Sequence, residues 1–168
     1  YLDVRDSTTV NQIIDRVERG FGRIDYLVHA AGILRLGHLD TFSDEDWLLT
    51  FDTNTRGTFT VCTSVVRSMK RHKKGSLVVI GSNASSTPRV GMGAYAASKA
   101  AITMMVKCLG LVLAQVNIRC NILAPDSADT PMQRQLLTQD KLVTQVIHGD
   151  LNNHRLGIPL GRIASCKQ

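Results

Sequence analysis

The chain has 168 residues, of which 43% are hydrophobic and 20% are charged, and its formal net charge is +6. This length and composition are typical of one globular domain with a buried core. No apolar run approaches the roughly 18 residues that a membrane-spanning helix needs, so we expect no membrane association.

Strand-like and helix-like patterns alternate along the chain. Residues 2–4 have the pattern of the end of a strand, and residues 8–21 form an amphipathic helical pattern that stops at Gly22. Strands alternating with long helices predict right-handed crossovers and a parallel sheet. The predicted fold class is therefore α/β, a Rossmann-like doubly wound sheet in three α/β/α layers. Further strands are predicted at residues 25–29, 77–81 and 118–123, and further helices at 44–69, 94–115 and 130–148.

The positive charge is concentrated in residues 70–74, at the end of a predicted helix and before Gly75. Cations complement the C-terminal dipole of a helix and glycine ends it. No aromatic residue interrupts this run, so we expect a solvated helix end and no nucleic-acid partner. Four widely spaced cysteines lack metal-ligand spacing. We therefore expect no metal and the reduced thiols of a cytoplasmic protein at Cys62, Cys108, Cys120 and Cys166.

Tyr95 and Lys99 are the most informative pair in the chain. Residues four apart lie on one face of a helix, which places an ammonium beside a phenol. A nearby positive charge lowers the pKa of a tyrosine, and such a tyrosine can exchange protons at neutral pH. Ser82 follows the strand at residues 77–81, and ligands of parallel sheets bind beyond the strand ends. It could therefore contact a substrate oxygen beside the tyrosine hydroxyl.

Asn54 falls inside the long helix predicted at residues 44–69. Asparagine is a poor residue for the middle of a helix, because its side chain competes for backbone hydrogen bonds. Its presence predicts a local distortion of the helix or a hydrogen-bonding role.

Asn54, Ser82, Tyr95 and Lys99, in this order, resemble the catalytic tetrad of the short-chain dehydrogenase/reductase family. Three further stretches resemble motifs of that family: Asp3-Val4, Leu-Val-His-Ala-Ala-Gly at 27–32, and Asn-Ile-Leu-Ala-Pro at 121–125. The resemblance implies that Tyr95 is the general base, that Ser82 positions the reacting oxygen, that Lys99 tunes Tyr95, and that Asn54 holds a water.

The resemblance also implies NAD as the cofactor. The residues that it places at the cofactor are Asp3, Val4, His29, Ala30, Gly32, Tyr95, Lys99, Pro125 and Thr130. Two positions depart from the family pattern, since His29 stands where asparagine is usual and Asp126 where glycine is usual. The glycine-rich phosphate loop of the family has no counterpart in the chain. We therefore expect residues 1–168 to be a single NAD(P)-binding domain, truncated at both ends, without the first βαβ unit and the C-terminal strand.

Within the family, Ile-Leu-Arg at 33–35 and Thr-Pro-Arg at 87–89 resemble members that oxidise a cyclic dihydrodiol carboxylate. Its carboxylate requires a cation, and the fork of an arginine suits it. Arg89 is the first candidate because it shares a loop with Ser82, and Arg35 is the second. The expected substrate-binding residues are Ser82, Arg89, Arg35, Met92 and Met132.

Two alternatives remain open from the sequence. A member of this family could instead act on a sugar, a steroid or a 3-oxoacyl substrate. The chain could also be a non-catalytic fragment that serves only in assembly. In the family the helices at residues 44–69 and 94–115 pack against copies of themselves, so we expect a homodimer or homotetramer.

Overall fold

The sheet is parallel and the chain alternates between strands and helices. The computed structural model describes residues 2–135, 140–153 and 155–166. Its three strands lie in the order β1-β2-β3, in a register that aligns Leu27 with Leu77 and Leu77 with Cys120. This arrangement confirms the Rossmann-like α/β fold class. The elements are α1 (Ser7–Phe21), β1 (Tyr26–His29), α2 (Asp44–Phe51), α3 (Gly57–His72), β2 (Gly75–Ile80), α4 (Gly93–Ala114), β3 (Ile118–Leu123), α5 (Pro131–Arg134) and α6 (Asp140–His148).

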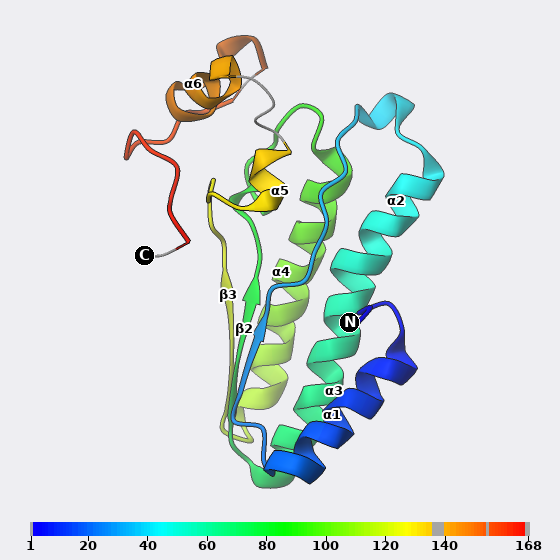
Figure 1. Cartoon of the computed structure of the whole chain (residues 1–168). Coiled ribbons are helices and arrows are strands. Elements are labelled where there is room, and N and C mark those ends of the chain that lie inside the picture. The colour runs from blue at the N-terminus through cyan, green and yellow to red at the C-terminus, as the bar shows by residue number, and fades with distance from the viewer. Residues whose placement is uncertain (1, 136–139, 154, 167–168) are drawn as a thin grey trace.

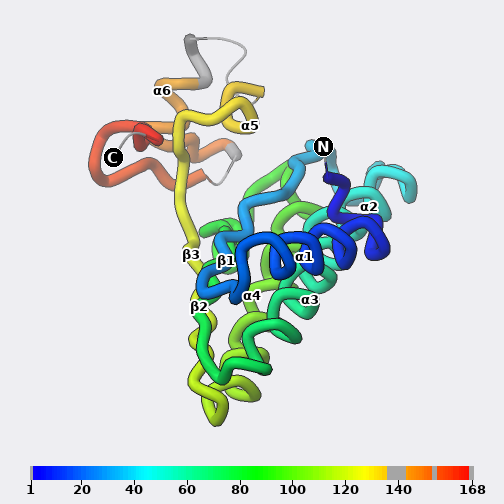
Figure 2. Tube along the Cα trace, turned by 60° about the horizontal axis from the view of Figure 1, so that its bottom comes forward, coloured from blue at the N-terminus to red at the C-terminus, as the bar shows by residue number. Residues whose placement is uncertain are grey.

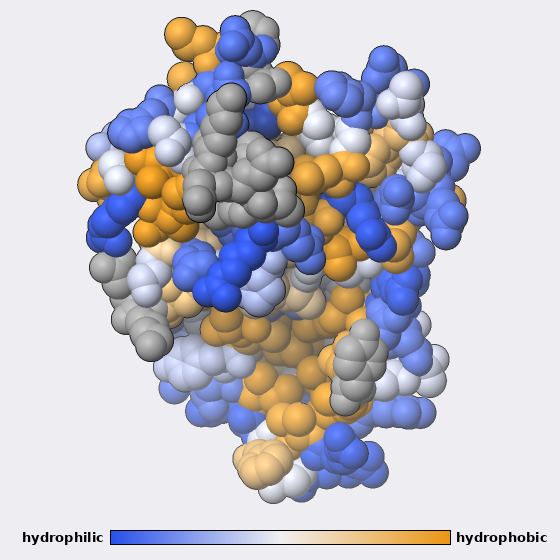
Figure 3. Space-filling view, turned by 45° about the horizontal axis from the view of Figure 1, so that its top comes forward, coloured by the Kyte–Doolittle hydropathy of each residue, from blue (hydrophilic) through white to orange (hydrophobic). Residues whose placement is uncertain are grey.

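The long helices cover one face of the sheet. Figure 1 shows α1, α3 and α4 on the same side of the strands, and Figures 1 and 2 show α5 and α6 beyond the strand ends. Alternate side chains of a strand point to opposite faces, and those on the other face stay exposed: Tyr26 is 77%, Val28 69% and Leu123 56% accessible. The described part of the chain thus holds two of the three expected layers. Apolar side chains also gather in the lower middle of the face shown in Figure 3.

The core lies between the sheet and the helices α3 and α4. Leu77 of β2 and Met69 of α3 are fully buried in it. At Gly75 an added Cβ would lie 2.3 Å from Met69 Sδ, so the start of β2 requires glycine to let α3 approach. The other buried members of this cluster are Cys62, Val65, Val66, Val79, Ile102, Val106, Leu113 and Ile118.

Helix α4 is long and apolar enough to cross a membrane by length and composition alone. The sequence pattern did not single it out, because Lys99 and Lys107 interrupt its apolar residues. The helix packs on β3 and supplies Ile102, Val106 and Leu113 to the core. Core packing accounts for only part of its apolar composition, because Met104, Leu111 and Val112 of the same helix are exposed.

The helix predicted at residues 44–69 is interrupted. Helix α2, capped by the Ser43 hydroxyl, passes through a π-helical turn at Asp52–Arg56 into α3. Asn54 lies in that turn, which confirms the predicted distortion. Such single π turns are frequently found at functional sites.

Residues 2–4, which were expected to be the end of a strand, form no strand in the structure. Asp3 O accepts a hydrogen bond from Asp6 N at 3.1 Å, and the Asp3 carboxylate binds the Arg5 guanidinium. These local bonds form a turn that leads into α1, whose first turn is capped by Asp6. The helix predicted at residues 130–148 corresponds to two helices in the structure, α5 and α6. Residues 136–139 of that range lie outside the described residues.

Candidate active site

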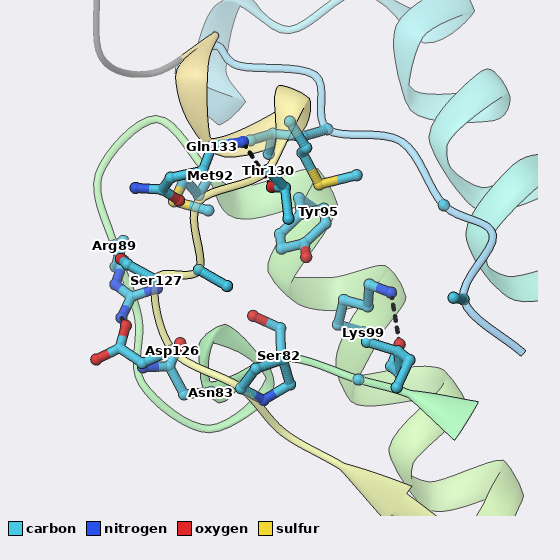
Figure 4. Close-up of a pocket in the computed structure, with 18 of the residues that line it drawn as sticks. Ser82, Asn83, Arg89, Met92, Tyr95, Lys99, Asp126, Ser127, Thr130 and Gln133 are labelled. Atoms are coloured by element: carbon cyan, nitrogen blue, oxygen red, sulfur yellow. Dashed lines mark hydrogen bonds and ion pairs between the residues drawn. The ribbon is translucent and has the colours of Figure 1, made fainter. Parts of the chain in front are cut away.

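A cavity of about 350 Å³ opens beyond the C-terminal ends of the three strands. Each strand end contributes to it, because parallel strands deliver their following loops to the same edge of the sheet. Figure 4 shows side chains from these loops and from the start of α4 around one space. The predicted site residues that line it are Ala30, Gly32, Ser82, Arg89, Met92, Tyr95, Lys99, Pro125, Thr130 and Met132.

Tyr95 and Ser82 present their hydroxyls to the cavity. Both residues are only 7% accessible, and their hydroxyls point into the same gap (Figure 4). Burial raises the pKa of Tyr95 above its usual value, while the Ser82 hydroxyl and the charge of Arg89 act in the opposite direction. The expectation that Lys99 holds the pKa of Tyr95 below that of a free tyrosine is therefore wrong for this structure, because desolvation of the phenolate outweighs the favourable contacts.

Lys99 is buried beside the tyrosine. Its Nζ donates a hydrogen bond of 2.9 Å to Ile80 O at the end of β2 and lies 5.7 Å from the centre of the Tyr95 ring. Burial lowers the pKa of Lys99 to about 8. An ammonium has three donors, and within the described residues Nζ has no other hydrogen-bond acceptor, so two N–H groups remain available toward the cavity.

Asn54 lies behind the cavity and does not line it. Its amide donates to Ile33 O at 3.0 Å and accepts from Ile33 N at 2.8 Å, and it also donates to Ser98 Oγ. An added Cβ at Gly32 would lie 3.2 Å from Asn54 Oδ1 and 3.4 Å from Lys99 Nζ. Asn54 therefore holds the loop after β1 against α4, and Gly32 permits this close approach.

His29 also lies away from the cavity lining. It is 4% accessible, and its Nε2 lies 3.0 Å from the Thr58 hydroxyl. That hydroxyl donates its proton to Asn54 O, so it must accept from Nε2–H. Burial, followed by the charge of Lys99, lowers the pKa of His29 to about 4. The imidazole thus supports the turn that carries Asn54.

We expect His29 to make the fold sensitive to acid. Between pH 6.5 and pH 4 the unfolded chain binds a proton that the folded chain excludes, so stability falls as the pH decreases. A pKa change from 6.5 to about 4 corresponds to about 3 kcal/mol. His29→Gln keeps a donor near Thr58 and removes this titration, so urea unfolding at pH 7 and pH 4 should show a smaller loss in the variant. Equal losses in the two proteins would contradict the assignment.

The two candidate arginines for a substrate carboxylate lie in different places. Arg89 lines the cavity, and its Nη2 lies 3.2 Å from Asp126 Oδ1. Arg35 is exposed and forms an ion pair with Asp46 at 3.4 Å, away from the cavity lining. The structure therefore brings the first candidate to the site and not the second.

Among the residues expected at the cofactor, Asp3 and Val4 do not line the cavity. Arg5 holds the pKa of the Asp3 carboxyl at about 2 through hydrogen bonds, and Val4 packs with Val10 and Val61. Thr130 lines the cavity, and its hydroxyl caps α5 by accepting from Gln133 N at 3.1 Å.

Four polar residues of the lining were not predicted from the sequence: Asn83, Ser127, Gln133 and Arg155. In the described part of the chain, Asn83 Oδ1 and Gln133 Nε2 are buried without a hydrogen-bond partner. Asn83 adjoins Ser82, which was a usable signal. Arg155 comes to the cavity from a distant segment, and nothing in its local sequence indicates this position.

Comparisons with known proteins identify relatives of this chain. The family model described as "short chain dehydrogenase" matches residues 1–141. Over 162 residues the chain is 48% identical to 2,3-dihydro-2,3-dihydroxybenzoate dehydrogenase of Bacillus subtilis (strain 168), covering 96% of this chain and 62% of that protein. It is 44% identical over 163 residues to the protein of the same name from Escherichia coli (strain K12), covering 97% and 66%.

A similar solved structure is that of a gluconate 5-dehydrogenase from Burkholderia cenocepacia J2315, in complex with NADP and tartrate. The TM-score is 0.89 at 31% identity, covering 98% of this chain and 61% of that one. The chain thus spans 62% to 66% of the length of the two curated relatives.

Proposed function

The chain belongs to the short-chain dehydrogenase family, and from this premise we propose that the protein oxidises 2,3-dihydro-2,3-dihydroxybenzoate to 2,3-dihydroxybenzoate with NAD. The observation that carries the proposal is one cavity that joins the Tyr95 and Ser82 hydroxyls, the Lys99 ammonium and the Arg89 guanidinium. An alcohol that carries a carboxylate matches this combination of groups. The product is the catechol acid used in catecholate siderophores, which is the pathway that we propose.

The residues around Lys99 fit the nicotinamide end of a dinucleotide. Gly32 leaves space beside Lys99 that a Cβ would fill, and Lys99 retains donors for a ribose. Ala30, Pro125 and Thr130 line the same space, and we propose that they hold the cofactor with Gly32 and Lys99. When bound, the nicotinamide supplies the hydride acceptor.

In the proposed mechanism Tyr95, as phenolate, takes the proton of the hydroxyl that is being oxidised. The Ser82 hydroxyl binds the same oxygen and holds it at the tyrosine. Lys99 places a positive charge 5.7 Å from the centre of the tyrosine ring, and such a charge favours the phenolate. Asn54 acts indirectly, because it holds the Gly32 loop against α4. The cyclic ketone can then tautomerise to the aromatic ring, so the overall oxidation is effectively one-way.

We also infer assembly into a homodimer or homotetramer through α3 and α4. A groove between these helices is lined by side chains that are mostly apolar, and Phe59 and Val112 are 53% and 64% accessible there. An apolar face of this kind fits a second copy of the chain. Sedimentation of the full-length protein that finds only monomers would contradict this inference. A cytoplasmic location is proposed from the free cysteines.

The proposal is tested by substrate preference. The full-length protein should reduce NAD with 2,3-dihydro-2,3-dihydroxybenzoate, and Arg89→Ala should raise the KM for it by about tenfold or more, because a charge-assisted bond is lost. Activity should be much lower with NADP, and with acetoacetyl thioesters and NADPH in the reverse direction. The alternative of a 3-oxoacyl reductase would give the opposite preference, and an unchanged KM in Arg89→Ala would refute the role of this arginine.

A further inference from the structure

A second arginine reaches the cavity from a part of the chain far from Arg89. Arg155 follows α6, and its side chain lines the same cavity as Arg89 and Asp126. Backbone hydrogen bonds join Arg155 and Asp150 in both directions, each with an N–O distance of 2.9 Å. This antiparallel bridge closes the loop at whose end Arg155 lies.

Two glycines hold that loop against the end of α6. Gly149 has a φ of +88°, and an added Cβ there would lie 2.9 Å from Arg155 O. At Gly157 an added Cβ would lie 2.6 Å from Ile147 O. These contacts leave no space for a side chain, so the backbone on both sides of Arg155 is packed in place.

The charges at this end of the cavity do not balance. Arg89 has an ion pair with Asp126, whereas the Arg155 guanidinium has no ion pair with another described residue. Among the residues that line this end of the cavity, two guanidiniums face one carboxylate, and the nearby Asp150 carboxylate outside the lining offsets part of the charge of Arg155. Burial and the charge of Arg89 lower the pKa of Arg155, with Asp126 and Asp150 acting against them. A partly buried cation in this position gains from an added anion.

We propose that Arg155 binds the substrate carboxylate together with Arg89, so that two guanidiniums from separate segments select anionic cyclic alcohols over neutral ones. The inference rests on the proposed function for the identity of the substrate. The phosphates of a dinucleotide are the other possible anion. Figure 4 places Arg89 and Asp126 across the cavity from Lys99, where the ribose is proposed to bind, and this separation favours the carboxylate.

The test combines turnover with direct binding in the full-length protein. Arg155→Gln should raise the KM for 2,3-dihydro-2,3-dihydroxybenzoate by about 10- to 100-fold and leave the Kd of NAD within about twofold. For the corresponding dihydrodiol without a carboxylate, KM should not change. Arg155→Lys should recover part of the effect, since it keeps the charge without the fork. Arg162→Gln is the matched control, because Arg162 is exposed on the same segment and does not line the cavity.

Calorimetric titration with benzoate and benzamide separates this inference from the proposed function. If wild type binds benzoate more tightly than benzamide, and Arg155→Gln removes that difference, Arg155 is an anion site even without dihydrodiol turnover. If turnover is found but neither KM nor benzoate binding responds to Arg155→Gln, the inference fails and the proposed function stands. A loss confined to NAD affinity would assign Arg155 to the dinucleotide and overturn the proposal. Thermal melting should show that the variants fold like wild type.

Discussion

Replacing Tyr95 by Phe should reduce turnover by about a thousandfold or more, which is within the range of general acid–base catalysis. The substitution removes the hydroxyl and keeps the ring, which packs with Ala84 and Met92. NAD affinity and stability should therefore change little. Stopped-flow measurement of NADH formation, with a separate NAD titration by fluorescence, distinguishes lost chemistry from lost binding.

Tyr26→Phe is the matched control, because Tyr26 is 77% accessible on β1 and lies away from the cavity. This control also removes a tyrosine hydroxyl, but one outside the cavity, and it should leave turnover unchanged. The burial of Tyr95 raises its pKa, so the wild-type rate should increase with pH as the phenolate forms. If Tyr95→Phe retained turnover with the same pH profile, another group would have to accept the proton.

Local patterns predicted the fold and the residues at each strand end. The strand at 118–123 agrees with β3 residue for residue, and Asn54 indicated a distortion because its side chain competes with helical hydrogen bonds. The Tyr95–Lys99 spacing predicted a common orientation, since both lie on α4. These features depend on residues close together in the sequence, where periodicity carries the information.

The chemistry of the site depended on contacts that no local pattern contains. Burial of Tyr95 reverses the expected direction of its pKa, and its extent is determined by packing among separate segments. His29 contacts Thr58 on α3 and not the cavity. Arg155 lies at the site because of the bridge to Asp150. Arg35 forms an ion pair with Asp46 away from the site. Assigning charged residues to a site therefore required the three-dimensional arrangement.

Lys99→Met should lower kcat/KM by about a hundredfold or more, because it removes the cation beside Tyr95 and the donors proposed for the ribose. The free energy of unfolding, in contrast, should increase in Lys99→Met at pH 7. Burial lowers the pKa of Lys99 from 10.5 to about 8, so at pH 7 the folded protein carries a charge that it disfavours. Methionine removes this cost and loses only the bond to Ile80 O.

The pH dependence tests this assignment directly. Between pH 8 and pH 10.5 the unfolded chain retains the Lys99 proton and the folded chain releases it, so wild-type stability should rise relative to Lys99→Met by up to about 3 kcal/mol. Lys107→Met is the control, because Lys107 is exposed on α4. Urea unfolding across this range measures the difference. If the unfolding free energies of wild type and Lys99→Met changed in parallel with pH, the Lys99 ammonium would have to be solvated. A solvated cation could not favour the Tyr95 phenolate as the mechanism requires.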